Sequence, residues 1–180
     1  MDDREILAAL RDEDRKDYAF NLLVRKYSRR LYWHIRRAVF DHNDADDLLQ
    51  NTFIKAWRYL PGFREESGLY TWLYRIATNE TINFLKSKRL RTMLSISGHE
   101  RGLAERIQAD PYFNGDEAMA RLYRAVIKLP PRQKMIFTMK YFEDMKFTEI
   151  AQVLDRSVGA VKASYHHAFT KIQNILNGNL

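Results

Sequence analysis

Residues 147–162 read Phe-Thr-Glu-Ile-Ala-Gln-Val-Leu-Asp-Arg-Ser-Val-Gly-Ala-Val-Lys and predict two helices joined by a tight turn. Ile150 and Leu154 give the first helix an apolar face, and the small side chain of Ala151 permits a close crossing of the two helices. Ser157 can cap the second helix and leave its amino-terminal end free to enter a DNA major groove. The pattern therefore favours a DNA-binding helix-turn-helix over a plain helical hairpin with a solvated basic face.

The sequence around this motif predicts a basic, helical C-terminal unit. A helix over residues 117–129 stops at Pro130-Pro131, after which a second helix runs to about Tyr141. The last helix is expected over residues 158–176. The unit as a whole, residues 117–180, carries ten basic and five acidic side chains, which suits a polyanionic partner.

The N-terminal part of the chain also predicts helices. Its first long helix has apolar residues at a three-to-four spacing, so the six basic residues between them face outward. The apolar set is Leu22, Leu23, Tyr27, Leu31, Ile35 and Val39, and the basic set is Arg25, Lys26, Arg29, Arg30, Arg36 and Arg37. Asn43 or Asp44 can cap a second helix, which ends at Pro61-Gly62, and a third is expected from about Tyr70 to Lys88.

The composition favours an all-α architecture. The 180 residues are 46% hydrophobic and include only 7 Gly and 4 Pro, too few to punctuate many strands and hairpins. The stretch 91–116 has no sustained apolar period and includes the turn-rich segments 95–99 and 110–115. We therefore expect two small helical domains, residues 1–90 and 117–180, joined by a flexible linker over 91–116.

Charge and targeting signals point to a cytoplasmic protein that binds a polyanion. The formal net charge is +7 and the isoelectric point is about 9.6. The N-terminus is acidic where a secretory signal would be basic, and no apolar run approaches the roughly 18 residues that a bilayer span needs. We therefore expect a cytoplasmic location without membrane insertion.

The sequence holds no recognisable catalytic or metal site. It lacks a Gly-rich phosphate loop, a His-Glu-x-x-His pair and a Ser motif at a strand-to-helix elbow. His166 and His167 are adjacent, so on a helix they would point about 100° apart and could not chelate one metal. Because the chain has no Cys, a disulfide scaffold and a thiolate zinc site are excluded. We expect no catalytic residue, no metal and no cofactor.

A mixed aromatic and basic segment spans residues 63–91. Its members are Phe63, Tyr70, Trp72, Tyr74, Arg64, Arg75, Lys86, Lys88, Arg89 and Arg91. Aromatic rings can stack unpaired bases while cations neutralise the backbone, and such stacking contributes about 1 to 3 kcal/mol per base. Aromatic residues at helical spacing are as often part of a core, so the residues alone leave the two interpretations even.

The second helix of the N-terminal unit begins with an acidic and amide face. Asp47, Gln50 and Asn51 stand at positions i, i+3 and i+4 and so share one side of the helix. Such a face could dock a basic helix of a partner protein. Capping and dipole complementarity explain the acidic residues without a partner, and the residues alone favour this explanation.

In this order and separation, the three segments resemble bacterial sigma factors of the extracytoplasmic-function group. Asp44-Ala-Asp-Asp-Leu-Leu-Gln-Asn-Thr-Phe-Ile-Lys-Ala-Trp-Arg58 and Phe63-Arg-Glu-Glu-Ser-Gly-Leu-Tyr-Thr-Trp-Leu-Tyr-Arg-Ile-Ala-Thr-Asn79 are similar to the second conserved region of that family. Leu129-Pro-Pro-Arg-Gln-Lys134, Phe147-Thr-Glu-Ile-Ala151 and Val158-Gly-Ala-Val-Lys162 are similar to its fourth region. The resemblance covers nearly the whole chain outside the linker and the first twenty or so residues.

The resemblance implies a subunit that joins core RNA polymerase, directs it to promoters and helps to open them. Binding to the clamp helices of the beta-prime subunit is implied for Asp47, Gln50 and Asn51. Contact with the minus-ten element is implied for Phe63, Arg64, Glu65, Ser67, Tyr70, Trp72, Arg75, Asn79 and Asn83. Contact with the minus-thirty-five element is implied for Arg156, Ser157, Gly159, Ala160, Lys162, Ala163 and His166. The helices before the recognition helix would dock on the beta flap, and the habit of the family implies an anti-sigma factor.

Four positions depart from the pattern of the family and bear on the promoter sequence that is read. Glu65 and Asp155 stand where the family commonly has Gly, Leu69 where it often has Phe, and Ser164 where Arg is frequent. An alternative hypothesis is a free-standing repressor that uses only the C-terminal unit and binds duplex DNA by itself. An RNA-modifying enzyme is a third hypothesis, for which the sequence offers no nucleophile or base.

Overall fold

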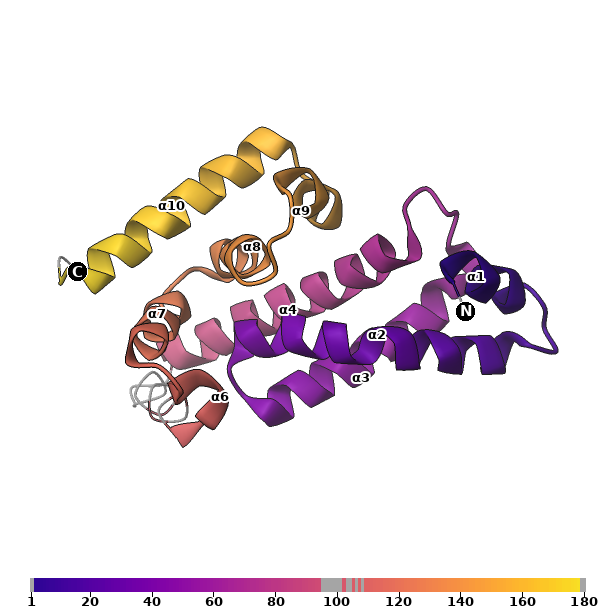
Figure 1. The fold of residues 1–180 in the computed structure, drawn as a ribbon, viewed down its shortest axis with the longest axis horizontal. Helices are drawn as coiled ribbons and strands as arrows, with labels where there is room; N and C mark the ends of the chain where they lie inside the picture. Colours follow the sequence, from indigo (N-terminus) through magenta and orange to yellow (C-terminus); the bar gives the residue numbers. More distant parts are fainter. Residues whose placement is uncertain (1, 95–101, 103–104, 106, 108, 179–180) are drawn as a thin grey trace.

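The structure is a computed structural model that describes residues 2–94, 102, 105, 107 and 109–178. In these ranges the chain forms helices and no strand (Figure 1). The elements are α1 (Asp3–Leu10), α2 (Lys16–Val39), α3 (His42–Tyr59), the 3-10 turn η1 (Leu60–Gly62), α4 (Leu69–Leu94), α6 (Pro111–Asn114), α7 (Glu117–Ile127), α8 (Pro131–Tyr141), α9 (Phe147–Leu154) and α10 (Val158–Leu176). The all-α prediction is confirmed.

Side chains that accept hydrogen bonds from free backbone N–H groups determine where two of these helices begin. The Asp41 carboxylate accepts from the N–H of Asp44, so Asp41 is the cap of α3 and the expected cap at Asn43 or Asp44 is wrong. Ser157 caps α10 as predicted, because its hydroxyl accepts from the N–H of Ala160 at 3.2 Å. The second helix of the helix-turn-helix therefore starts at the expected residue.

The stretch expected as a linker contains more helix than its sequence predicts. α4 runs to Leu94 instead of ending near Lys88. Farther along, Asp110 caps the short α6, whose Phe113 is only 1% exposed. Phe113 packs against Phe40 and Tyr123, which come from other elements, and helical periodicity could not show that partner surface. The expected turn-rich segment 95–99 lies outside the described residues.

The N-terminal unit is built on α2, α3 and α4, with α1 packed on α2 (Figure 1). Leu23, Leu31 and Ile35 of α2 and Leu73 and Ala77 of α4 are fully buried. The three α2 residues belong to the apolar set predicted for that helix, and they pack against the buried side chains of its neighbours.

Four of the six basic residues expected to face outward from α2 are exposed and Arg37 is half-buried. The expectation is wrong for Arg36, which is 5% exposed because it forms an ion pair with Asp110.

The C-terminal unit consists of α7, α8, α9 and α10, and it packs on the N-terminal unit. α8 contacts α2 and α4, and α9 contacts α4. Figure 1 shows both helices above α4. One cluster of buried side chains continues from Leu73 in α4 to Ile150 in α9. Among the described helices, none combines the length and the hydropathy that crossing a bilayer requires.

Candidate nucleic-acid interface

The amino-terminal end of α10 is an open surface. Val161, Ala168 and Ile172 are buried and hold the opposite side of the helix on its own unit. All seven residues expected at the minus-thirty-five element are exposed, and they lie in α10 or in the turn before it. They are Arg156, Ser157, Gly159, Ala160, Lys162, Ala163 and His166. The structure thus brings this predicted set together at one accessible end of a helix.

The chemistry at this end of α10 suits a DNA groove. At Gly159 no described heavy atom outside its own stretch of helix lies within 4 Å of the place that a Cβ would take, so a ligand can approach the backbone. Lys162 Nζ lies 5.9 Å from the centroid of the ring of Phe147, the first residue of α9. The amino-terminal end of a helix carries partial positive charge, which favours a phosphate group.

Left-handed backbone occurs at both positions where the resemblance stated above leads us to expect Gly. Asp155, in the turn before α10, has φ 52° and ψ 55°. Glu65, in the loop before α4, has φ 57°. Gly adopts this conformation without the steric cost that a Cβ brings, so a Gly would fit either position without strain.

The aromatic residues of the 63–91 segment divide between the core and the surface. Tyr74 is fully buried, and its ring centroid lies 4.2 Å from that of Tyr70. The Arg30 guanidinium lies 4.2 Å from the Tyr70 centroid, and because burial raises the pKa of Tyr70, this contact joins a cation to a neutral ring. Phe63 and Trp72 are half-buried, with ring centroids 4.7 Å apart. Both interpretations of the segment therefore apply, each to different residues.

The remaining residues expected at the minus-ten element differ in their exposure. Four of them, Arg64, Glu65, Asn79 and Asn83, are exposed, and Ser67 is half-buried.

Arg75 differs from these residues because α9 lies against it. Its Nη2 donates to the backbone oxygen of Gln152 at 2.7 Å. The buried Nε of Arg75 has no hydrogen-bond partner among the described residues. A side chain expected to meet DNA is thus held by another part of the same chain.

The three residues expected to share one face of α3, Asp47, Gln50 and Asn51, are all exposed. The neighbouring acidic residues have partners inside the unit: Asp44 pairs with Lys88 at 2.7 Å, and Asp46 pairs with His42 at 3.2 Å. Asp47 makes no ion pair with any residue that the structure describes. Pairing inside the unit therefore accounts for Asp44 and Asp46 and leaves Asp47 exposed to solvent.

Sequence reasoning missed Ile54, which extends this face. Its side chain is 56% exposed and lies one helical turn after Gln50 and Asn51. Residues three and four apart share one side of a helix. An exposed apolar residue beside polar ones is a feature of protein–protein contact surfaces. Ile54 stands seven residues after Asp47, and this spacing in the sequence indicates that both lie on the same side of the helix.

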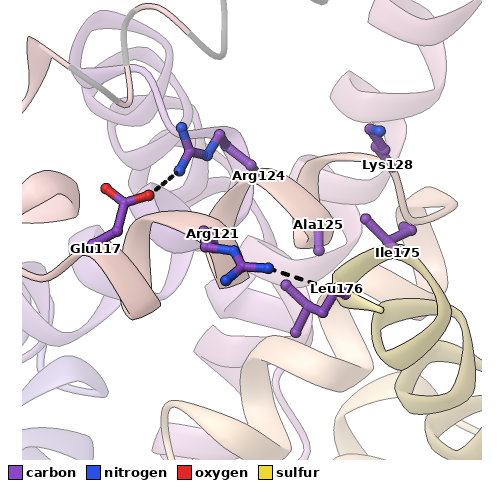
Figure 2. A pocket seen from close by; sticks show the side chains of 7 residues that line it. All are labelled: Glu117, Arg121, Arg124, Ala125, Lys128, Ile175 and Leu176. Carbon is purple, nitrogen blue, oxygen red and sulfur yellow. Dashed lines mark hydrogen bonds and ion pairs between the residues drawn. The ribbon is translucent and has the colours of Figure 1, made fainter. Parts of the chain in front are cut away.

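A hollow lies between α7 and the carboxyl-terminal end of α10, with a volume of about 310 Å³. Its lining residues are Glu117, Arg121, Arg124, Ala125, Lys128, Ile175 and Leu176 (Figure 2). Arg124 pairs with Glu117 at 3.0 Å, and Arg121 donates to the backbone oxygen of Leu176 at 3.2 Å. The hollow is thus lined by three cations, from α7 and the residue that follows it, and by two apolar residues at the end of α10. Sequence analysis named no residue here, although these cations are spaced i, i+3 and i+7.

The described residues include no cluster of three His, Asp or Glu side chains that could hold a metal ion. His166 and His167 have ring centroids 6.4 Å apart and planes at 87°. Two neighbouring rings so oriented do not direct their nitrogen atoms at one point.

Comparison with family models matches two segments of the chain. The model described as Sigma-70 region 2 matches residues 23–91, and the model described as Sigma-70, region 4 matches residues 119–172. The first segment holds the α3 face and the α4 surface, and the second holds the amino-terminal end of α10.

Curated relatives match nearly the whole chain. The protein named ECF RNA polymerase sigma-E factor of Escherichia coli (strain K12) is 31% identical, over 97% of this chain and 94% of the relative. The protein of the same name from Salmonella typhimurium (strain LT2) is 31% identical over the same shares. That of Haemophilus influenzae is 30% identical, over 97% of this chain and 95% of the relative.

Two solved structures share the fold. The structure of CnrH in complex with the cytosolic domain of CnrY has a TM-score of 0.66 at 24% identity and covers 99% of both chains. The co-crystal structure of the sigma factor RpoE in complex with the anti-sigma factor NepR from Bartonella quintana has a TM-score of 0.64 at 19% identity. It covers 88% of this chain and 96% of the RpoE chain.

Proposed function

The chain belongs to the extracytoplasmic-function sigma factors of the sigma-70 family, and from this membership we propose that its exposed surfaces direct core RNA polymerase to promoters. Its partners in transcription initiation are core polymerase and promoter DNA. The observation that carries the proposal is the open, capped end of α10 within the segment that matches region 4.

The amino-terminal end of α10 reads the minus-thirty-five element in the major groove. Small residues at Gly159, Ala160 and Ala163 let the helix backbone come close to base edges. Arg156 and Lys162 neutralise phosphates on either side of the groove. The Ser157 cap keeps the first turn of the helix in place for both kinds of contact.

The loop before α4 and the exposed side of α4 bind the minus-ten element as an unpaired strand. The half-buried rings of Phe63 and Trp72 offer a stacking surface, with Arg64 close by in the loop to neutralise the backbone. Asn79 and Asn83 are exposed farther along α4 and can hydrogen-bond bases. Stacking on such rings offsets the cost of unstacking a base, and this is how the surface assists melting.

Two further surfaces bind core polymerase. Asp47, Gln50, Asn51 and Ile54 form the α3 face that docks on the beta-prime clamp helices, where DNA would be repelled by the carboxylate. The hollow between α7 and α10 receives the beta flap. Its three cations and apolar end fit an apolar partner segment flanked by acidic residues.

The organisation of the chain follows from these roles. Residues 1–90 act as the region 2 domain, 117–180 as the region 4 domain, and 91–116 as a linker that runs near the RNA exit path. An anti-sigma factor is a further partner, in keeping with the complexes in which both fold neighbours were solved. The protein performs no catalysis of its own and works in the cytoplasm, where the polymerase is.

Reconstitution tests the function directly. Purified core polymerase with this protein should bind and transcribe a subset of fragments from the source genome, and the protein alone should not. Failure to transcribe any fragment contradicts the proposal. Tight binding of duplex DNA by the isolated protein supports the repressor hypothesis instead.

Two substitutions separate the roles of the two units. Asp47→Arg should weaken core binding because it reverses the charge of the α3 face, whereas Asp14→Arg, at an exposed acid before α2, should not.

Lys162→Ala should leave core binding unchanged and lower promoter affinity about threefold to tenfold, as expected for the loss of one phosphate contact. Equal effects of both substitutions on both assays contradict the assignment.

A further inference from the structure

α1 packs on α2 although it lies outside the segment that matches Sigma-70 region 2, which begins at residue 23. Its apolar side chains Ile6, Ala9 and Leu10 are buried in the same cluster as those of α2. Leu10 is the last residue of α1, so this packing also sets the place from which the next side chain, Arg11, extends.

Polar contacts hold the start of α1 as well. The Tyr27 hydroxyl donates to the Asp3 carboxylate at 2.7 Å, and Lys26 Nζ lies 2.8 Å from the same group. Asp2 and Glu5 form a reciprocal capping box in the first turn. α1 is therefore held on α2 by its apolar face and by its first turn.

Arg11 reaches from the end of α1 to the loop before α4, residues 63–68. Its Nη2 pairs with Oε1 of Glu65, 54 residues farther along the chain. Figure 1 shows α1 beside this loop. Oε2 of Glu65 makes no hydrogen bond or ion pair with any residue that the structure describes. The carboxylate is thus held at one oxygen and open at the other.

An acidic residue at this position of the loop carries two costs. The backbone of Glu65 has φ 57°, a region that residues with a Cβ enter at a steric cost. A carboxylate beside a DNA strand also repels the phosphates. Arg11 offsets the second cost at Glu65, whereas the next acid, Glu66, makes no ion pair within the described ranges. The cation from α1 therefore makes one of the two loop carboxylates compatible with DNA.

We propose that Arg11 is a positioning residue, which holds the Glu65 carboxylate toward the unpaired minus-ten strand so that it accepts a hydrogen bond from the exocyclic amine of a base. The proposal rests on the proposed function, which places this loop on the minus-ten element. An ionised carboxylate only accepts hydrogen bonds, and cytosine presents a donor at N4 where thymine presents the acceptor O4. Glu65 should therefore select cytosine over thymine at one position of that element.

The ion pair acts on the loop more than on the stability of the fold. The side chains of Arg11 and Glu65 are 72% and 39% exposed, and ion pairs so open to water add little to stability. Removal of either partner should therefore leave the melting temperature and the helical circular dichroism unchanged. An effect on loop order or on base choice then reports positioning, because a merely structural role would change stability.

Five variants test the proposal, each in the full-length chain. Arg11→Ala removes the cation, and Arg11→Lys keeps it. Arg4→Ala is the matched control, because Arg4 is an exposed cation of the same helix with no ion pair to a described residue. Glu65→Gln keeps the shape of the side chain but offers an amide that both donates and accepts. Glu66→Gln, its control, removes the same charge one residue along.

Nuclear magnetic relaxation of the free chain gives the first readout, without polymerase. The backbone order parameters of residues 64–67 should fall from about 0.85 toward about 0.6 in Arg11→Ala and Glu65→Gln. Arg11→Lys should restore them, and Arg4→Ala and Glu66→Gln should leave them unchanged. A loop that is already flexible in the unsubstituted chain, or one whose order Arg11→Ala does not change, overturns the positioning role.

Base discrimination by the holoenzyme gives the second readout. Core polymerase with each variant is titrated with a transcribed promoter whose minus-ten strand is unpaired and carries cytosine or thymine at each position in turn. The unsubstituted protein should prefer cytosine about tenfold or more at one position. Glu65→Gln should abolish this ratio of affinities, and Arg11→Ala should lower it about twofold to fivefold, the range for one exposed ion pair. Both control variants should keep the ratio.

The two readouts tell the possible failures apart. A cytosine preference that is absent, or that survives Glu65→Gln, in a holoenzyme that transcribes overturns the assigned base contact and leaves the proposed function intact. Loop order that depends on Arg11 in a protein that supports no transcription contradicts the proposed function, and with it the base contact, and leaves the positioning role standing.

Discussion

Lys134 is a buried cation that lowers the stability of the folded chain. It is 6% exposed at the start of α8, and its Nζ lies 5.9 Å from the centroid of the Phe40 ring. Burial, and then the nearby cations Lys88 and Arg89, lower the pKa of Lys134 to about 8. The charged form is therefore disfavoured in the folded chain relative to the unfolded chain.

We expect Lys134→Met to raise the free energy of unfolding at pH 7 by up to about 3 kcal/mol, because Met fills a similar volume without charge. An unfolded Lys keeps a pKa near 10.5, so between about pH 8 and 10.5 the unfolded state binds more protons than the folded state. The unsubstituted protein should therefore gain stability over that window, and the variant should lack this gain. Urea unfolding at about pH 8 and about pH 10.5 measures the free energy of unfolding of both proteins. An equal change with pH in the two proteins would contradict the prediction.

Asp155 carries a second local cost, at the turn of the helix-turn-helix. Its φ of 52° lies in the region that Gly enters without steric conflict. We expect Asp155→Gly to raise the free energy of unfolding by up to about 1 kcal/mol, and Asp155→Ala to lower it, since Ala has a Cβ and no polar group to compensate. Thermal melting of the unsubstituted protein and the two variants tests this expectation. Equal melting temperatures of the Gly and Ala variants would show that the turn is unstrained.

At the scale of the element, the start of α10 combines a cap with a surface for DNA. Ser157→Ala should lower the free energy of unfolding by about 1 kcal/mol, because the N–H of Ala160 loses its acceptor. Ser157→Asp keeps an acceptor at the cap and places a carboxylate where a phosphate would lie. We therefore expect Ser157→Asp to melt like the unsubstituted protein and to bind promoter DNA, as holoenzyme, more weakly than Ser157→Ala. Promoter affinity that simply follows stability would contradict this separation.

α3 presents an interface that combines polar residues with Ile54. Ile54→Ala should weaken core binding about threefold to tenfold, the loss expected when an apolar interface contact is removed. Stability should hardly change, because the side chain is already 56% exposed. Tyr59→Ala removes a side chain that is 51% exposed on the same helix but off this face, and so serves as the control. Titration of labelled core with each variant gives the comparison.

At the scale of the whole molecule, the two units share a continuous buried cluster. Side chains from α2 and α4 belong to it together with side chains from α8 and α9. We expect the full-length chain to unfold in a single transition, with a calorimetric enthalpy close to the van't Hoff enthalpy. Differential scanning calorimetry is the measurement, and two resolved transitions would mean that the units unfold independently.

The sequence predicted the helices and the exposure of the residues on two candidate surfaces, for local reasons. The exposure of Lys162 and its neighbours follows from the helical period around buried Val161, and the direction of Asp47 follows in the same way from buried Leu48. The cap at Asp41 was missed because several Asn and Asp residues stand close together, and only backbone geometry selects one of them. The domain boundaries and the roles of individual residues stay predictions.

By itself, the sequence determined the helical class, the helix-turn-helix with its Ser157 cap, and the separation of basic and acidic faces. Only the tertiary structure decided that Tyr74 is core, that Arg75 is held by α9, and that Glu143 meets His34 from 109 residues away. The physical reason is the sequence distance over which each effect acts, because periodicity and capping depend on neighbours within a few turns of one helix. The pairing of distant groups depends instead on how whole helices pack, and no local pattern records that.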